Sequence, residues 1–308
     1  MKISIFGATG FVGNYILKSL VKKEYRIKTL VRKKSINKLF NSEKLEIIHG
    51  DINDINVIEN TIKDTDIIIY NIGIIREFRN KNITFENLHL KGFKRVLESA
   101  KKQSIKRIIL MSANGVSSKG TKYQTTKWNA EQELINSGID WTIFRPSLIF
   151  GKPMHSSQPE FCTQLKKDMI MLPIPAPLFH KGILPLNAGM FQLSPIHVEN
   201  IASFFVNSIE NNDSINKIFH LGGLKSFTWK EIIQIISKSC QKNKFMIPAP
   251  VIFIKLISSL FERFESFPIT KDQITMLLEG NIVNENHFNE FNITPIEFNK
   301  DTLKYLKK

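Results

Sequence analysis

The fold of this chain is decided by residues 2–13, Lys2-Ile3-Ser4-Ile5-Phe6-Gly7-Ala8-Thr9-Gly10-Phe11-Val12-Gly13. Residues 2–6 form a short run that is mainly apolar and rich in β-branched side chains, which is typical of a buried strand. An apolar pattern of helical period begins near Phe11. The glycines lie between the two patterns, so the stretch predicts a strand that turns sharply into a helix.

A strand, a glycine-rich turn and a helix together present bare backbone amides and the positive end of a helix dipole at one point, which favours a pyrophosphate. Gly7 permits the sharp turn, Gly10 lets the backbone approach a phosphate, and Gly13 lets the helix pack closely on the strand. The spacing G-x-x-G-x-x-G differs from the commoner G-x-G-x-x-G, but the roles are alike. The expected cofactor residues of the turn are Gly7, Thr9, Gly10, Phe11, Val12 and Gly13.

Composition bounds the class of protein. The 308 residues include 42% hydrophobic and 23% charged side chains, as in ordinary globular proteins. The net charge is +15, but the lysines are spread along the chain and form no stripe interleaved with aromatic residues, so we expect no nucleic-acid partner. Cys162 and Cys240 match no metal or redox spacing, which predicts reduced thiols and no metal site. With a strand beginning at residue 2 we expect no leader and a cytoplasmic location.

Strand and helix patterns alternate through the first half of the chain. The further expected strands are residues 26–31, 45–48, 66–70, 107–111 and 141–144, and the further expected helices are residues 85–103 and 123–136. Repeated β-α-β units predict an α/β fold, a Rossmann-type doubly wound parallel sheet with right-handed crossovers. We assign this dinucleotide-binding domain to residues 1–151.

Residues 152–308 are predicted to form a small C-terminal substrate lobe. Residues 152–195 are rich in Pro and Met and suggest an irregular lid, whereas a strand and a helix near 196–223 return to the core and further helices follow. Within 247–264 an apolar run is broken by Lys255 and is shorter than the ~20 residues that span a bilayer. As a helix it packs on the core, or it lies on a membrane surface or a partner.

Tyr123 and Lys127 are spaced i, i+4, so they project from one face of a helix that begins after a buried strand. An ammonium within a few ångströms lowers the pKa of a phenol, and we expect this of Lys127 and Tyr123. Tyr123 would then exchange a proton with a substrate hydroxyl or carbonyl while hydride moves to or from a nicotinamide, whose ribose Lys127 would hold. The alternative interpretation is a half-buried tyrosine beside a solvated lysine.

The residues after the second strand bear on the choice of cofactor. An enzyme of this architecture that uses NAD offers an acid there to the ribose 2′-hydroxyl, whereas Arg32 and Lys33 can pair with a 2′-phosphate. We therefore predict that NADP is preferred over NAD. The alternative is that both residues belong to the lysine-rich background of the chain.

Several motifs together resemble a known superfamily. They are the glycine turn, Asn71-Ile72-Gly73, Met111-Ser112-Ala113-Asn114-Gly115, the Tyr123/Lys127 pair, Arg145-Pro146-Ser147-Leu148-Ile149-Phe150-Gly151 and Pro195-Ile196-His197-Val198-Glu199-Asn200. The set is similar to the atypical, extended branch of the short-chain dehydrogenase/reductases, which includes epimerase-like and NmrA-like proteins. Gly73-Ile74-Ile75-Arg76-Glu77 and residues 272–295 most resemble the nucleotide-binding accessory subunit of respiratory complex I and its bacterial relatives.

This resemblance implies further site residues. Asp51 and Ile52 would border the adenine, Asn71, Ile72 and Gly73 would line the cofactor, and Pro146 and Ser147 would flank the nicotinamide. The serine that polarises the substrate carbonyl would be Ser112, although the match can fall on Asn114 instead.

Three functions remain open on this basis. The first is an oxidoreductase that acts on a small carbonyl or quinone-like substrate. The second is a non-catalytic dinucleotide-binding accessory or assembly factor of a respiratory complex, or a redox sensor, located at the inner face of a membrane. A sugar-nucleotide epimerase or dehydratase is less favoured, because only 11 positions separate Ser112 from Tyr123. The sequence does not predict the oligomeric state.

Overall fold

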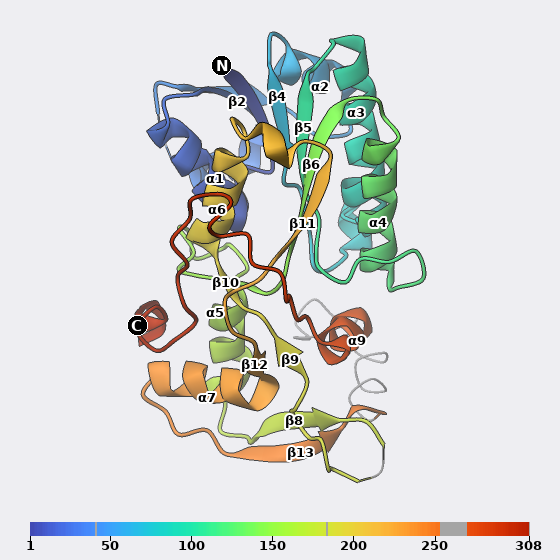
Figure 1. Ribbon diagram of the computed structural model, residues 1–308. Helices are drawn as coiled ribbons and strands as arrows, with labels where there is room; N and C mark the ends of the chain where they lie inside the picture. Colours follow the sequence, from blue (N-terminus) through green and yellow to red (C-terminus); the bar gives the residue numbers. More distant parts are fainter. Residues whose placement is uncertain (41, 183, 253–269, 308) are drawn as a thin grey trace.

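The computed structural model describes residues 1–40, 42–182, 184–252 and 270–307 (Figure 1). A central parallel sheet holds seven strands, which are β1 (Lys2–Phe6), β2 (Arg26–Val31), β3 (Leu45–His49), β4 (Ile67–Tyr70), β5 (Arg107–Met111), β6 (Asp140–Pro146) and β11 (Lys217–Leu221). Five longer helices accompany it: α1 (Phe11–Lys22), α2 (Ile55–Ile62), α3 (Gly92–Lys102), α4 (Lys122–Ile135) and α6 (Val198–Asn207).

The strand order is β3-β2-β1-β4-β5-β6-β11, and every neighbouring pair is parallel. The chain works outward from β1 in one direction and from β4 in the other, so the topological switch point lies between these two strands. All four residues of β4 are buried, as a central strand covered on both faces requires. The prediction of a Rossmann-type doubly wound α/β sheet is confirmed.

Helices cover both faces of the sheet. α1 and α6 pack on one face, and α2, α3 and α4 pack on the other (Figure 1). The first face is rich in phenylalanine: the Phe144 ring lies 4.8 Å from that of Phe205 and 6.0 Å from that of Phe291. Phe291 belongs to the C-terminal part of the chain, so residues far apart in sequence complete the core of the sheet.

A lobe built mainly from the second half of the chain lies below the carboxyl ends of the strands (Figure 1). Its elements are β7 (Ile149–Phe150), α5 (Phe161–Leu165), the π-helix η4 (Lys166–Ile170), β8 (Ala176–His180), β9 (Gln192–Leu193), β10 (Ile196–His197), β12 (Phe227–Thr228), α7 (Trp229–Ser239), β13 (Met246–Pro250) and α9 (Lys271–Glu279). Trp229 anchors a separate apolar core, where its ring stacks at 5.8 Å on that of Phe191.

Residues 152–195 hold more regular structure than the sequence indicated. β8 within this segment pairs in parallel with β13, about seventy residues later, so its order depends on a partner that local periodicity does not reveal. The apolar stretch 247–264 lies only partly in the structure, as β13 and the two residues after it, because residues 253–264 are outside the described residues. Among the helices that are described, none is both long and apolar enough to cross a bilayer.

Candidate functional site

The glycine turn between β1 and α1 is tightly built. Gly7 has a positive φ of +93°, and the Gly10 amide donates to the Gly7 carbonyl at 3.1 Å. A Cβ atom on Gly13 would lie 2.0 Å from the same carbonyl oxygen, so only glycine lets α1 approach this closely. The first amides of α1 lack partners inside the helix. A diphosphate therefore fits this turn, where bare amides and the helix dipole meet.

The end of β4 lies beside the turn. The Asn71 amide donates to the Phe6 carbonyl at 2.9 Å, and a Cβ atom on Gly7 would meet the Asn71 carbonyl oxygen at 2.7 Å. Gly73 is exposed, and a Cβ atom there would lie 3.6 Å from the Lys127 Nζ atom. The structure thus brings residues 71–73 next to both the glycine turn and Lys127.

The residues expected near the adenosine end differ in exposure. Arg32 and Lys33 are exposed directly after β2, and neither forms an ion pair with any residue that the structure describes. Asp51 is half-buried and its Oδ1 atom accepts from the Asn53 amide at 3.1 Å, whereas Ile52 is buried in the core beneath the sheet edge. The two cations are therefore free to meet an anion, and the Asp51 side chain already closes a local turn.

Asn14 fixes the position of the segment that carries Arg32 and Lys33. Asn14, fully buried in the first turn of α1, donates from Nδ2 to the Lys38 carbonyl at 2.9 Å. Lys38 ends the 3₁₀ helix η1 (Lys33–Lys38). This bond ties η1 to the helix that begins at the glycine turn.

Tyr123 and Lys127 lie in the first half of α4, whose start is capped on both sides. The Thr121 hydroxyl accepts from the Gln124 amide, and the Gln124 side chain accepts from the Thr121 amide at 2.7 Å. Such a capping box satisfies two amides that the helix leaves free and fixes where α4 begins. Its position determines which way Tyr123 and Lys127 face.

Lys127 is buried, with 4% of its surface exposed. Its Nζ atom donates to the Met111 carbonyl at 2.8 Å and lies 3.5 Å from the Ile72 carbonyl. Burial lowers the pKa of Lys127 to about 8, and the nearby Glu131 carboxylate partly opposes this shift. The ammonium group is thus held between the ends of β4 and β5.

The sequence predicts that Lys127 lowers the pKa of Tyr123, and the direction of this predicted shift is wrong. Burial raises the pKa of Tyr123 to about 12 rather than lowering it. The phenol ring is packed edge-on against Phe85, at 5.6 Å, and His89, at 5.2 Å, while backbone carbonyls take the hydrogen bonds of the Lys127 ammonium. Within the described residues the Tyr123 hydroxyl has no hydrogen-bond partner.

His89 is a site residue that the sequence analysis missed. It lies in the π-helix η3 (Glu86–Lys91), is 1% exposed, and accepts at Nε2 from the Ile74 amide at 3.1 Å. Its Nδ1 atom must therefore carry the proton and donates to the Thr126 hydroxyl at 3.2 Å. Burial and the charge of Lys127 lower its pKa well below the usual value. The neutral ring links the β4 loop to α4.

No local signal marks His89, because the sequence predicts one uninterrupted helix over residues 85–103. The structure instead has a π-helical turn at His89. This wider turn is often found at functional sites. The His89 partners Ile74 and Thr126 are 15 and 37 positions away.

The two candidates for the carbonyl donor differ in their partners. Asn114 donates from Nδ2 to the Asn281 Oδ1 atom at 2.7 Å, and its Oδ1 atom accepts from the His220 Nδ1 atom at 2.7 Å. The Ser112 hydroxyl is buried and has no partner among the described residues. Ser112 therefore keeps hydrogen-bonding capacity that no described residue uses, whereas both polar atoms of the Asn114 side chain bond to the protein.

Residues 279–283, which we call the C-terminal strap, run along this edge of the sheet. The Asn281 carbonyl accepts from the Ser147 hydroxyl at 2.7 Å, and the Glu279 carboxylate accepts from the Gln124 side chain at 2.8 Å. Ser147 directly follows Pro146, the last residue of β6. The strap thus ties together the ends of β6 and α4.

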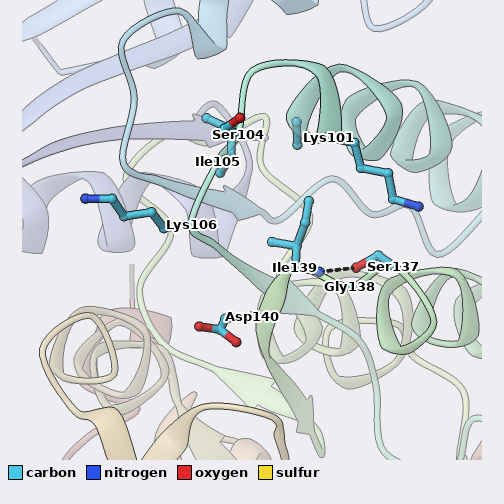
Figure 2. A pocket seen from close by; sticks show the side chains of 9 residues that line it. Lys101, Ser104, Ile105, Lys106, Ser137, Gly138, Ile139 and Asp140 are labelled. Carbon is cyan, nitrogen blue, oxygen red and sulfur yellow. Dashed lines mark hydrogen bonds between the residues drawn. The ribbon is translucent and has the colours of Figure 1, made fainter.

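The opposite edge of the sheet holds a hollow of about 400 Å³, where β5 and β6 begin (Figure 2). Lys101, Lys106, Ser137 and Asp140 are among its lining residues. Since ligands of open α/β sheets bind at the carboxyl ends of the strands, this hollow is separate from the candidate site.

Comparison with known proteins adds three findings. A family model described as NAD(P)H-binding matches residues 7–164. The 40 kDa subunit of mitochondrial NADH-ubiquinone oxidoreductase from Neurospora crassa is 23% identical over 312 residues, covering 99% of this chain and 78% of that protein. UDP-glucose 4-epimerase from Vibrio cholerae is 23% identical over 287 residues, covering 84% and 82%.

Among solved structures, the UDP-glucose 4-epimerase of Thermotoga maritima with UDP-glucose superposes with a TM-score of 0.73. It is 15% identical in sequence, and the match covers 100% of this chain and 97% of that one. This likeness shows a shared fold that extends through the C-terminal lobe.

Proposed function

We propose that this chain, which belongs to the NAD(P)H-binding family, is an oxidoreductase for a small carbonyl or quinone-like substrate. The observation that carries the proposal is the position of Lys127, whose buried Nζ atom is held at the Met111 carbonyl, directly before Ser112, and one helical turn after Tyr123. The Ser112 hydroxyl has no hydrogen-bond partner among the described residues. Lys127, Ser112 and Tyr123 all lie at the carboxyl edge of the sheet, where the glycine turn also lies.

Each side chain has a distinct role in this proposal. A pKa of about 12 keeps Tyr123 protonated near neutral pH, so its hydroxyl donates a proton to the substrate oxygen in the reductive direction. Ser112 donates a hydrogen bond to the same oxygen, and the charge of Lys127 stabilises the phenolate that forms. A bound nicotinamide dinucleotide supplies or accepts the hydride.

NADP is the preferred cofactor in this proposal. The exposed Arg32 and Lys33 follow β2, no acidic residue stands at positions 32–34, and a 2′-phosphate offers these cations a charged partner. Residues 7–13 hold the diphosphate, and Lys127 with Asn71, Ile72 and Gly73 lines the nicotinamide half. Asp51 and Ile52 border the adenine, and Pro146 and Ser147 flank the nicotinamide.

The test combines cofactor titration with Tyr123→Phe. The wild-type protein should bind NADPH more tightly than NADH in calorimetry and oxidise NADPH with a member of a panel of carbonyl compounds and quinones. Tyr123→Phe should reduce turnover by at least about 100-fold and leave cofactor affinity unchanged. Tyr25→Phe is the control, because the Tyr25 hydroxyl bonds Glu210 far from the site. Equal turnover of Tyr123→Phe and wild type contradicts the proposal.

A second candidate is a non-catalytic dinucleotide-binding subunit or assembly factor. The likeness to a subunit of a respiratory enzyme over nearly the whole chain favours it, as does a net charge of +15 that suits the anionic inner face of a membrane. In that case the protein co-purifies with a large membrane assembly, and Tyr123→Phe retains this association and the biological role.

A sugar-nucleotide epimerase is the third candidate, and the structure of the site disfavours it. The C-terminal strap bonds Asn114 and Ser147 at the strand ends, where a sugar pocket would have to open. Turnover of a UDP-sugar by the purified protein would favour the epimerase over the other two candidate functions.

A further inference from the structure

Gln158 reaches from the C-terminal lobe onto the glycine turn. Its Nε2 atom lies 3.1 Å from the Thr9 carbonyl oxygen and 3.2 Å from the Gly10 carbonyl oxygen. Gln158 is 5% exposed, and a buried amide is tolerated only where its donors and acceptors are paired. The contact is therefore a built part of the turn rather than a surface encounter.

The rest of the side chain and the segment around it are also fixed. The Gln158 Oε1 atom accepts from the His155 backbone amide at 3.2 Å, and the Gln158 backbone amide donates to the His155 carbonyl at 3.0 Å. A few residues earlier, the Lys152 carbonyl accepts from the Tyr15 hydroxyl of α1 at 2.7 Å. Residues 152–158 are thus fastened to the start of the dinucleotide domain at two points.

Fixing these carbonyls also fixes the amides of the turn. A trans peptide is planar, with its C=O and N–H pointing in opposite directions, so the orientation of the Gly10 carbonyl sets that of the Phe11 amide. The Gly10 carbonyl also accepts from the Asn14 backbone amide at 3.1 Å, and Gln158 adds a side-chain constraint to it and to the neighbouring Thr9 carbonyl. Preorganised donors bind an anion better than donors that must first be ordered.

We propose that Gln158 is a positioning residue for the dinucleotide diphosphate and that it couples the C-terminal lobe to the cofactor. This inference rests on the dinucleotide binding in the proposed function, not on catalysis. Through the Gly10 peptide plane Gln158 orients the Phe11 amide at the start of α1, and it does not touch the adenosine end. Its loss should weaken only ligands that carry the diphosphate.

The test is Gln158→Met, which keeps the length of the side chain and removes its hydrogen bonds. Calorimetry should show about five- to tenfold weaker binding of NADPH, and of NADH, because two hydrogen bonds to the turn are lost. Adenosine 2′-monophosphate, which can reach Arg32 and Lys33 but has no diphosphate, should bind as it does to the wild type. Gln158→Glu, which sets a carboxylate against two carbonyls, should weaken NADPH further.

Gln164→Met is the matched control, because Gln164 is exposed in the same lobe. Circular dichroism and the unfolding midpoint without ligand report whether each variant folds. Unchanged NADPH affinity of Gln158→Met overturns the inference, and so does an equal loss for NADPH and adenosine 2′-monophosphate, which marks a general structural role. A wild-type protein that binds no dinucleotide refutes the proposed function instead.

Discussion

The Nζ atom of Lys127 lies 2.8 Å from the carbonyl oxygen of Met111, the residue before Ser112. A charged amine buried here is costly in free energy, and the depressed pKa of about 8 records that cost. The same amine lies 3.5 Å from the Ile72 carbonyl oxygen, so it is held between the ends of β4 and β5. The folded chain therefore keeps an unfavourable charge in the position that the proposed chemistry requires.

Lys127→Met should stabilise the cofactor-free protein near neutral pH. The folded-state pKa of about 8 lies below the ordinary value of 10.5, so charge burial opposes folding by about 3 kcal/mol at pH 7. This penalty falls as pH rises from 8 to 10.5, because the unfolded chain then binds more protons than the folded one. Urea unfolding should show a higher free energy of unfolding for Lys127→Met than for the wild type at about pH 7, and a smaller difference between the two at about pH 10.

The control for this prediction is Lys122→Met, because Lys122 is exposed in the same helix. Its free energy of unfolding should stay within about 0.5 kcal/mol of the wild type. A Lys127→Met variant that is less stable than the wild type at neutral pH would show that the amine is well solvated in the fold.

His89→Gln should make the fold less sensitive to acid. The pKa of His89 is lowered in the folded state, so the unfolded chain takes up the proton first as pH falls below about 6.5, and stability is lost there. Glutamine can accept from the Ile74 amide and donate to Thr126 but does not titrate. Urea unfolding between about pH 7 and pH 5 should show a smaller decline than in the wild type. Equal declines would place the His89 ring in contact with solvent.

Gly13→Ala should disrupt the turn even without cofactor. The new Cβ atom would lie 2.0 Å from the Gly7 carbonyl oxygen, and backbone atoms on both sides cannot move apart without displacing α1. The free energy of unfolding should fall by about 2 kcal/mol or more. Gly73→Ala is the control, since its Cβ atom would meet nothing closer than the Lys127 Nζ atom at 3.6 Å. Similar stability of the two variants would mean that α1 approaches β1 less closely.

Arg32→Ala should separate the two cofactors. Removal of a charged donor to the 2′-phosphate should weaken NADPH binding about tenfold, while NADH, which has no such phosphate, should bind almost unchanged. Lys217→Ala, at an exposed position where β11 begins, controls for the loss of one positive charge. A parallel loss for both cofactors, measured by calorimetry, would remove Arg32 from the 2′-phosphate site.

The sheet and the family resemblance could be predicted because each rests on local pattern. Strands such as 67–70 are nearly continuous apolar runs, and the glycine turn directly follows the first of them. The resemblance to the extended short-chain dehydrogenase/reductases is confirmed by the relatives, and the α/β fold by the structure. The pairing of Tyr123 with Lys127 was also accessible, since one helical turn separates them.

Other parts of the site depend on contacts between distant segments. Gln158 and the C-terminal strap meet the dinucleotide domain across more than 130 positions, and no periodicity reports such a contact. The strap also distinguishes Asn114 from Ser112, because it bonds the Asn114 side chain and not that of Ser112. The direction of the Tyr123 pKa shift was predicted wrongly for the same reason. The spacing identifies Lys127 as a neighbour, but the burial that raises the pKa comes from packing against residues such as Phe85 and His89.

The sequence by itself determined the order of strands and helices, the glycine turn and the family, because these follow from side-chain period and from glycine at fixed spacing. Only the tertiary structure decided which polar groups are buried, which are paired and which remain free. Burial and pairing depend on the whole set of neighbours in space, and the free energy of a charge or a hydrogen bond depends on that set more than on its place in the chain.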